Sequence, residues 1–315
     1  MREEPVVAPA RTVVVTGAST GIGRACALLL DSRGWTVFAG VRNDMDAQSL
    51  RRAASVRLTP IHLDVTDQRS IEQAALAVRR IGDGGLQGLV NNAGIATPAP
   101  LEYLELHELR RQLEINLIGQ LAITQALLPS LRSGHGRIVN ISSLAGKLTT
   151  PFNGAYSAAK HGMEAFTDAL RLELRPWGIH VCAVEPGTIA TEMPKKLSRD
   201  AATLLQSLPA EGRQRYGSAF QAYVHTLTEH ARNGSPPEVV ARAVEHALTA
   251  NRPKTRYPAG ANAKKMMLLY RVLPDRILDR RILQFFQLPT GSLQQRTAEA
   301  GHPGESAGRA STSTD

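Results

Sequence analysis

A tyrosine and a lysine four residues apart have the most specific chemistry in this sequence. Tyr156 and Lys160 lie at the start of an expected helix, and their spacing places both side chains on one helix face. A free tyrosine has a pKa of about 10, which is too high for a base at neutral pH. A nearby ammonium group favours the phenolate and lowers that pKa. The pair therefore predicts an acid/base tyrosine, although Tyr-x-x-x-Lys alone is also common as a plain surface pair.

A glycine-rich stretch, residues 16–23 (TGASTGIG), offers a second specific chemistry. It lies between an expected strand at 12–16 and an expected helix at 21–33. Glycines allow a tight turn and a close approach of the backbone to a pyrophosphate, and the helix start adds unpaired N–H groups and a partial positive charge. This context favours a dinucleotide-binding turn over an ordinary strand-to-helix turn.

The elements that must position these residues follow a regular alternation. Strands are expected at 12–16, 36–41, 56–63, 86–91, 137–142 and 179–184, and helices at 21–33, 101–128 and 155–174. Short strands rich in Val and Ile that alternate with helices indicate a parallel sheet covered on both faces. We therefore predict an α/β fold, a Rossmann-type doubly wound parallel sheet in a single domain over residues 10–260. Such a sheet places its ligand crevice at the carboxyl ends of the strands.

The last third of the chain is less regular. Residues 192–235 are too long for a structureless connection, so we expect helical pieces that cover the substrate site. Pro236 and Pro237 are expected to open a helix that runs to Ala250, and residues 254–257 a last strand. Residues 261–288 are expected to form a basic amphipathic C-terminal helix. The tail at 289–315 is rich in Gly, Ser, Thr and Gln and is expected to be disordered.

Two motifs give the sequence a family resemblance. Residues 16–23 match the TGxxxGxG pattern, and residues 91–94 read NNAG after the fourth expected strand. With the Tyr-x-x-x-Lys pair, the sequence resembles the short-chain dehydrogenase/reductase family over roughly residues 10–192. The resemblance implies an NAD(P)-dependent oxidoreductase that transfers a hydride between the cofactor and a carbonyl or alcohol.

The same resemblance implies four catalytic residues, namely Asn116, Ser143, Tyr156 and Lys160. Ser143 lies thirteen residues before Tyr156, which is the family's separation, and its neighbour Ser142 is the weaker candidate. Ser143 would bond the substrate oxygen, and Tyr156 would donate a proton to it or remove one. Lys160 would lower the tyrosine pKa and bind the nicotinamide ribose, and Asn116 would hold a water in a proton relay. Hydride chemistry belongs to the cofactor, while the protein supplies position and electrostatics.

The predicted cofactor site spans several strand ends. It comprises Gly17, Ser19, Thr20, Gly21, Ile22, Gly23, Arg42, Asp64, Val65, Asn92, Ala93, Gly94, Tyr156, Lys160, Pro186, Gly187, Ile189 and Thr191. The resemblance assigns Asp64 to the adenine, although a helix cap or turn is an alternative role that Asp67 could equally supply. The segment around Ile189 and Thr191 would hold the nicotinamide carboxamide and the phosphates.

The choice of cofactor depends on the end of the second strand. An acidic residue there would accept the ribose hydroxyls of NAD, whereas a basic one would pair with the 2′-phosphate of NADP. Val41 fills the acidic position and Arg42 follows, with a planar fork that suits phosphate. We therefore favour NADP, while Arg42 as a solvated loop residue and the nearby Asp44 and Asp46 keep NAD open. No metal is expected, because no cluster such as HExxH is present.

The substrate prediction rests on a branch resemblance. Residues 151–156 and 170–187 look like the branch that contains 17β-hydroxysteroid and retinol dehydrogenases, which implies a bulky apolar, steroid- or retinoid-like alcohol or ketone. The family also implies a homodimer or homotetramer built on the helices at 101–128 and 155–174. The basic helix at 262–288 is expected to cover the pocket or a subunit contact, with a peripheral membrane contact as the alternative.

Composition narrows the possible partners, locations and functions of the protein. The 315 residues carry a net charge of +9, but the basic residues are dispersed and aromatic residues are only 4%, which argues against nucleic acid as a partner. Two cysteines, no signal-like apolar segment and no bilayer-length apolar run lead us to expect a cytoplasmic protein, with peripheral membrane contact left open. A catalytically silent dinucleotide-binding sensor and a membrane-surface protein are the alternative functions. All four catalytic positions are present, which argues against the silent sensor.

Overall fold

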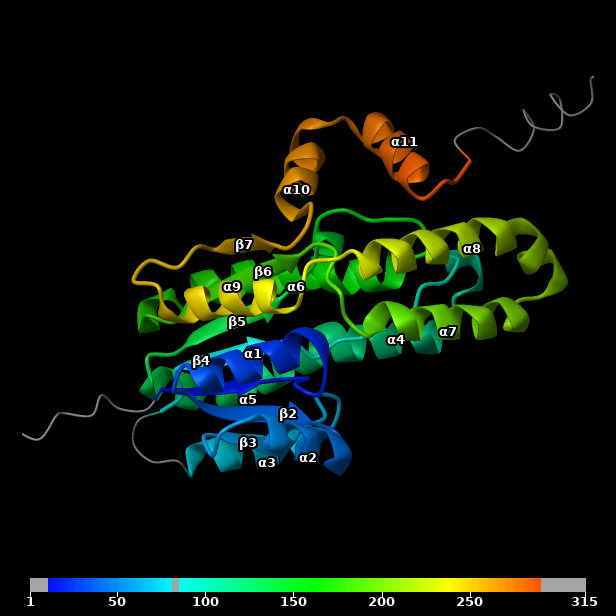
Figure 1. The fold of residues 1–315 in the computed structure, drawn as a ribbon. Coiled ribbons are helices and arrows are strands. Elements are labelled where there is room, and N and C mark those ends of the chain that lie inside the picture. The colour runs from blue at the N-terminus through cyan, green and yellow to red at the C-terminus, as the bar shows by residue number, and fades with distance from the viewer. Residues whose placement is uncertain (1–10, 81–84, 290–315) are drawn as a thin grey trace, which may run out of the picture.

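A computed structural model describes residues 11–80 and 85–289 and contains a seven-stranded parallel sheet of order β3-β2-β1-β4-β5-β6-β7 (Figure 1). The strands are β1 (Thr12–Val15), β2 (Thr36–Val41), β3 (Leu58–His62), β4 (Gly88–Asn91), β5 (Arg137–Ile141), β6 (His180–Pro186) and β7 (Arg256–Ala259). The predicted single-domain, doubly wound parallel sheet is thus confirmed. The strand order reverses between β1 and β4, which is where such sheets bind ligands.

Alternation along the strands explains why both faces of the sheet are covered. Val14 lies in register with Phe38 on β2 and Leu89 on β4, and this row packs against helices α3 (Gln68–Arg79) and α5 (Gly119–Ser133). Its neighbours Val13 and Val15 point to the opposite face, where α1 (Gly21–Ser32), α2 (Asp44–Ala53) and α9 (Glu238–Thr249) pack. Successive side chains of a strand point to opposite faces, so each strand contributes to both cores.

The long helix expected at 101–128 is divided into several pieces. The structure has a 3₁₀ turn at Leu101–Tyr103, α4 (Leu106–Leu113), a π-helical turn at Glu114–Ile118, and then α5. The π-turn contains Asn116, and π-turns inside helices are frequent at functional positions. Gly119 follows directly, and a Cβ on it would lie 2.4 Å from the carbonyl oxygen of Val65. The wider turn and the glycine together let this helix approach the end of β3.

The helix that carries Tyr156 and Lys160 and the region over the sheet follow further along the chain. The helix α6 (Gly154–Glu173) packs against β6, and α7 (Met193–Ser207) and α8 (Ala210–Arg232) lie side by side beyond one end of the sheet (Figure 1). The helix α8 shares an apolar cluster with the segment that precedes α6, through Phe220 and Phe152. Residues after α6 therefore form an apolar layer against the catalytic segment.

The single basic helix expected over 261–288 is two helices, α10 (Ala263–Val272) and α11 (Asp275–Phe285). The break falls at Pro274, which has no backbone N–H and favours an extended conformation at the residue before it. Leu273 adopts that conformation, with φ −87° and ψ 133°. The amphipathic pattern continues across the break, which is why the periodicity alone predicted one helix. Of the predicted disordered tail, residues 290–315 lie outside the described part of the chain.

Candidate active site

The glycine-rich turn after β1 packs tightly against the segment after β4. Gly17 and Gly21 have φ of +63° and +54°, a region that favours glycine. A Cβ on Gly17 would lie 2.7 Å from the Cα of Ala93, and one on Gly23 would lie 2.2 Å from the carbonyl oxygen of Gly17. These positions exclude side chains, so backbone atoms form the surface that a pyrophosphate would approach.

Thr16 joins the two motifs into one unit. Its Oγ1 accepts hydrogen bonds from the backbone N–H groups of Asn92 and Ala93, both at 2.9 Å. The amide of Asn92 donates in return to the carbonyl oxygens of Thr16 and Gly17, at 2.9 and 3.0 Å. Sequence reasoning did not assign Thr16 a role of its own, although it is the first residue of the motif. The turn is therefore fixed from both sides.

The start of α1 is arranged to receive a negative charge. Thr20 is the N-cap residue, but its side chain makes no capping hydrogen bond, and the first helical turn has no acidic residue. Ser19 and Ile22 flank this start and are partly exposed. A Cβ on Gly21 would lie 3.3 Å from the Cγ2 of Thr191, so the loop after β6 reaches the same place. Unpaired N–H groups and the helix dipole suit a phosphate here.

The loop after β6 is held in place by Ser235. The backbone of Ala190 donates to the Ser235 carbonyl oxygen at 2.9 Å, and Ile189 is buried between them and the core. Gly187, which follows Pro186, donates to β7 at 2.9 Å and has no room for a Cβ. The sequence contains no pattern that singles out Ser235, because its partners come from two other segments.

Asp64, at the end of β3, lies in a local turn. Its Oδ1 accepts hydrogen bonds from the N–H and the hydroxyl of Thr66, at 2.9 and 2.8 Å. Burial would raise the pKa of Asp64, but the two bonds from Thr66 lower it on balance. The helix-cap role left open for Asp64 belongs to Asp67, which accepts from Arg69 at 3.0 Å at the start of α3. Asp64 and the buried Val65 therefore remain candidates for the adenine side.

The end of β2 presents an exposed arginine. Val41 is buried in the sheet and Arg42 follows it at the surface. Asn43 caps α2 by accepting from the Asp46 N–H at 2.9 Å, and its amide donates to the Asp46 carboxylate at 2.8 Å. One of the two acids that kept NAD open is thus engaged in a helix cap.

Ser143 is the serine that faces Tyr156. It begins a 3₁₀ turn, Leu144–Gly146, where its Oγ accepts from the Ala145 N–H at 3.1 Å. The Ser143 hydroxyl is also close enough to Tyr156 to lower the pKa of its phenol in part. Ser142 is buried instead, and its hydroxyl lies 2.8 Å from where a Cβ on Gly146 would be. The structure therefore favours Ser143 over its neighbour, as the sequence spacing predicted.

Tyr156 and Lys160 lie together on α6. The Lys160 Nζ donates to the Ile141 carbonyl oxygen at 2.7 Å and lies 5.7 Å from the centre of the Tyr156 ring. Burial lowers the pKa of Lys160 to about 8, against the opposing charge of Glu164. Burial raises the pKa of Tyr156, and its bond with Ser143 lowers it in part. The net direction for the phenol is upward in the chain by itself, whereas the Lys160 ammonium was expected to lower it.

Asn116 is buried and its amide is paired with Ile95. Its Nδ2 donates to the Ile95 carbonyl oxygen and its Oδ1 accepts from the Ile95 N–H, both at 2.8 Å. The Oδ1 would also lie 2.9 Å from a Cβ on Gly94. Asn116 therefore fixes the segment that follows the NNAG motif, a contact that the sequence did not indicate.

A row of buried polar side chains lies beneath the site. The Asn91 amide donates to Thr124 Oγ1 and Asn140 Oδ1, both at 2.9 Å, and the Asn140 amide donates to Thr167 Oγ1 at 2.8 Å. The row joins β4 and β5 to α5 and α6. The sequence could have predicted this row, because Asn91 and Asn140 each interrupt an apolar strand and a buried amide requires hydrogen-bond partners.

Aromatic side chains cover the catalytic segment. Phe152, four residues before Tyr156, has a left-handed φ of +63°, and its ring centre lies 5.3 Å from Phe220 and 5.5 Å from Tyr223. Burial raises the pKa of Tyr223, and the nearby Tyr156 adds to this effect. The predicted helical segment thus brings apolar rings close to the reacting tyrosine.

Comparison with known proteins establishes the family. The family model for short chain dehydrogenases matches residues 11–202, and the chain belongs to this family. Retinol dehydrogenase 5 of Mus musculus is 37% identical over 89% of this chain and 90% of that protein. The human 17-beta-hydroxysteroid dehydrogenase type 6 is 39% identical over 85% of this chain and 86% of its own length. The predicted branch of the family is therefore confirmed.

A solved structure adds the cofactor class. A short chain dehydrogenase from Burkholderia cenocepacia J2315, in complex with NADP, superposes with a TM-score of 0.67. It is 26% identical and covers 87% of this chain and 98% of its own. The chain is an oxidoreductase that uses a nicotinamide dinucleotide, and the uncapped helix start and side-chain-free turn described above fit such a group.

Two further findings concern metal binding and membrane-spanning helices. Within residues 11–80 and 85–289, no three His, Cys, Asp or Glu side chains are grouped so that they could hold a metal ion. No helix in this same part of the chain has the length and hydropathy needed to cross a membrane.

Proposed function

We propose that this protein is an NADP-dependent dehydrogenase or reductase that interconverts a bulky apolar alcohol and its carbonyl. The observation that carries the proposal is the proximity of the three groups: the Lys160 Nζ lies 5.7 Å from the centre of the Tyr156 ring on the same helix, and the Ser143 hydroxyl is close enough to lower the pKa of Tyr156 in part. These groups lie on elements whose neighbours form the dinucleotide-binding turn. The arrangement places an acid/base phenol and a second hydroxyl where a substrate oxygen would bind.

Each of the three groups has a separate task in this proposal. The Ser143 hydroxyl holds the substrate oxygen, and Tyr156 gives that oxygen a proton in reduction or removes one in oxidation. The Lys160 ammonium stabilises the phenolate and binds the nicotinamide ribose. The bound cofactor delivers or accepts the hydride. Because burial raises the pKa of Tyr156 with Lys160 in place, the phenol is the form ready to donate a proton in reduction.

We propose that Asn116 contributes to the reaction by holding a relay water and by fixing the segment after Gly94. Both polar atoms of its amide are engaged with Ile95, so a relay water must use the acceptor capacity that these bonds leave, or backbone groups of the π-turn. Its amide meanwhile fixes the segment after Gly94 next to the site. We propose this combined role because it reconciles the expected relay with the observed contacts.

The residues proposed to hold NADP lie at four strand ends. Backbone atoms of the turn and the α1 start would bind the pyrophosphate, Asp64 the adenine, and Ile189 and Thr191 the nicotinamide half. Arg42 would pair with the 2′-phosphate. The buried Val41 and the engagement of Asp46 with its helix cap support NADP over NAD.

A steroid- or retinoid-like substrate is supported by two observations. The relatives named above act on retinol and on 17β-hydroxysteroids by their names. In this chain, the partly buried ring of Phe152 lies four residues before Tyr156 and packs on Phe220 and Tyr223, which are fully buried. Such a ring favours an apolar substrate, because contact with it removes apolar area from water.

The test is a spectrophotometric assay of NADPH formation or consumption with a panel of retinoids, hydroxysteroids and simple ketones. Wild type and Tyr156→Phe are compared at equal cofactor saturation. Tyr156→Phe is expected to lower kcat by at least about a hundredfold, the usual contribution of general acid/base catalysis. Equal rates in the two proteins would overturn the proposal, and circular dichroism of the variant checks that its fold is intact.

Two assembly proposals accompany this function. The helices α10 and α11 have an inner face that packs on α8 and an outer face that is apolar and basic, so we propose that the cytoplasmic protein makes peripheral contact with anionic membranes. We also propose a homodimer or homotetramer built on α4 to α6, where Leu106, Ile118 and Leu172 are exposed. Sedimentation of the full chain measures its oligomeric state and so tests the second proposal.

A further inference from the structure

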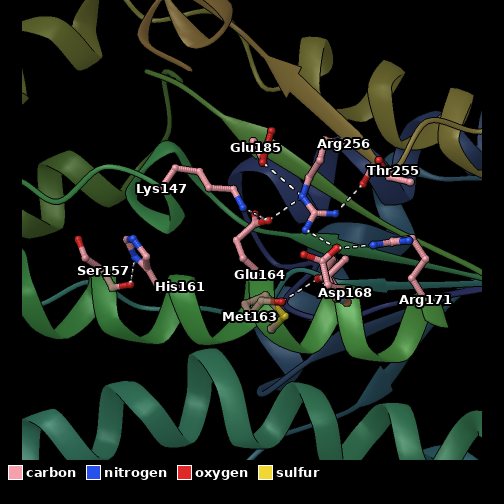
Figure 2. A network of polar contacts seen from close by, with 12 residues as sticks. Lys147, Ser157, His161, Met163, Glu164, Asp168, Arg171, Glu185, Thr255 and Arg256 are labelled. Atoms are coloured by element: carbon pink, nitrogen blue, oxygen red, sulfur yellow. Dashed lines mark hydrogen bonds and ion pairs between the residues drawn. The ribbon is translucent and has the colours of Figure 1, made fainter. Parts of the chain in front are cut away.

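A cluster of charged side chains surrounds Glu164 on α6 (Figure 2). Glu164 follows Lys160 by one turn of α6, and only 4% of it is exposed. Its Oε2 lies 2.9 Å from the Nζ of Lys147 and 2.7 Å from the Nε of Arg256. A buried carboxylate is unfavourable unless cations compensate it, so these two contacts fix both its charge and its position.

Glu164 also contacts the turn that contains Ser143. A Cβ on Gly146 would lie 3.0 Å from the Cγ of Glu164 and 3.0 Å from the carbonyl oxygen of Lys160. Lys147, the next residue, is the one that binds the Glu164 carboxylate. The carboxylate therefore joins the end of the serine turn to the helix that presents Tyr156 and Lys160.

The other charges around this group come from every element packed against it. They are Asp168 and Arg171 on α6, Glu185 on β6, Arg256 on β7, Lys147 after the 3₁₀ turn and Arg271 on α10. The Arg256 guanidinium contacts Asp168 at 2.9 Å and Glu185 at 3.6 Å as well as Glu164. Arg256 is therefore shared between Glu164 and two other acidic side chains, and Glu164 itself lies one helix turn from Lys160.

We propose that Glu164 is a positioning residue whose carboxylate keeps the Lys160 ammonium protonated beside Tyr156. This inference rests on the proposed function, because it assumes the roles given above to Tyr156 and Lys160. Burial opposes the charge of Lys160, and Glu164 is the group whose charge works against that effect. No such through-space action of Glu164 reaches Tyr156, which lies two turns away on the same helix.

The proposal predicts a change at one side of the pH profile. Alcohol oxidation requires a Tyr156 phenolate together with a Lys160 ammonium, so activity falls at high pH when the lysine loses its proton. Glu164→Gln removes a negative charge, lowers the pKa of Lys160 and brings that fall to lower pH. At acidic pH the lysine is protonated in both proteins, so their rates converge there. Lys147→Met removes a positive charge and shifts the fall to higher pH.

The experiment measures kcat/KM for alcohol oxidation with NADP across the pH range for wild type, Glu164→Gln, Lys147→Met and Asp168→Asn. We expect the alkaline limb of Glu164→Gln to move down by about one pH unit, the low end of the effect of a charge one helix turn away. The limb of Lys147→Met moves up. Asp168→Asn is the matched control, because Asp168 also binds Arg256 but lies two turns from Lys160 and is half exposed. Its limb is expected to coincide with that of wild type.

A second measurement needs neither cofactor nor turnover. The ε-carbon resonance of Lys160 is titrated by NMR in 13C-lysine-labelled protein, with Lys160→Met used to assign it. A lower pKa in Glu164→Gln and a higher one in Lys147→Met support the proposal. If Glu164→Gln does not fold, Lys147→Met decides alone, because it retains the contact between Glu164 and Arg256.

Uniformly lower profiles with unmoved alkaline limbs, or a Lys160 titration that is the same in all variants, would overturn the inference. Failure of the proposed function has a different signature, namely a Tyr156→Phe variant as active as wild type. In that case the NMR titration still tests the contact between Glu164 and Lys160 directly.

Discussion

The proposed preference for NADP depends chiefly on Arg42. It is exposed at the end of β2 with no acidic residue at the position before it. We predict that Arg42→Ala weakens NADP binding by about tenfold, the value of one charge-assisted hydrogen bond, and leaves NAD binding nearly unchanged. Fluorescence titration of both cofactors at low and high salt measures this, since a surface contact is screened by salt.

The matched control is Arg51→Ala. Arg51 is an exposed arginine in the last turn of α2, so its loss changes the net charge equally without removing a group from the strand end. Equal weakening of NAD and NADP in Arg42→Ala, or an equal loss in Arg51→Ala, would show that Arg42 does not recognise the 2′-phosphate.

The residues proposed to be catalytic could be proposed from sequence because their spacing is local. Tyr156 and Lys160 share one helix, and Ser143 follows the strand before it, so short stretches of chain determine their separation. The contacts of Asn116 could not be placed in this way. Its partner Ile95 belongs to a loop whose path depends on the π-turn, and no periodic pattern predicts a π-turn.

At the scale of elements, β6 carries a buried acid next to the proposed nicotinamide loop. Glu185 is fully buried one residue before Pro186, and burial raises its pKa to about 7, with Glu164 adding to the effect and Lys147 opposing it. The protonated form is thus favoured in the folded state. Its stabilising contribution is complete below the ordinary glutamate pKa of about 4.3 and is lost as the pH rises through about 7.

Glu185→Gln is therefore predicted to gain stability at pH 8 relative to wild type, by up to roughly 3 kcal/mol, because glutamine cannot ionise. The free energy of unfolding, from denaturant titrations at pH 5 and pH 8, measures this. The pH 5 value is the internal control, since the wild-type carboxyl is protonated there. A difference that does not grow between the two pH values would contradict the assigned state of Glu185.

Two features of the helices and strands could not be predicted from the sequence. Pro274 is a residue type that ends helices, but the apolar repeat continues past it in α11. The repeat therefore predicts a single helix where the structure has two. The contact between Glu164 and Arg256 joins α6 to the edge strand β7. Such a contact exists only once the sheet is assembled, and neither residue stands in a local pattern that predicts the other.

At the scale of the whole molecule, the C-terminal helices combine two expectations that were set as alternatives. Leu278, Ile282 and Phe286 pack inward against the apolar cluster of α8. Leu268 on α10 and Ile277 on α11 are exposed instead, by 61% and 46%. Exposed basic side chains stand among them, namely Lys264, Lys265, Arg271, Arg276, Arg280 and Arg281. One face packs on the protein, and the other presents the apolar and cationic groups that the proposed membrane contact would use.

This division predicts how the full chain interacts with lipid vesicles. Apolar side chains insert at the interface and basic ones are attracted by anionic lipid, so binding requires both. The double variant Leu268→Ser and Ile277→Ser is expected to lose co-sedimentation with phosphatidylserine vesicles, and high salt is expected to weaken wild-type binding. Leu172→Ser is the matched control, since Leu172 is 61% exposed on α6, away from these helices. Absence of wild-type binding to the vesicles, or an equal loss of binding in Leu172→Ser, would contradict the membrane contact. The outer face of α10 and α11 would then be available for contact between subunits.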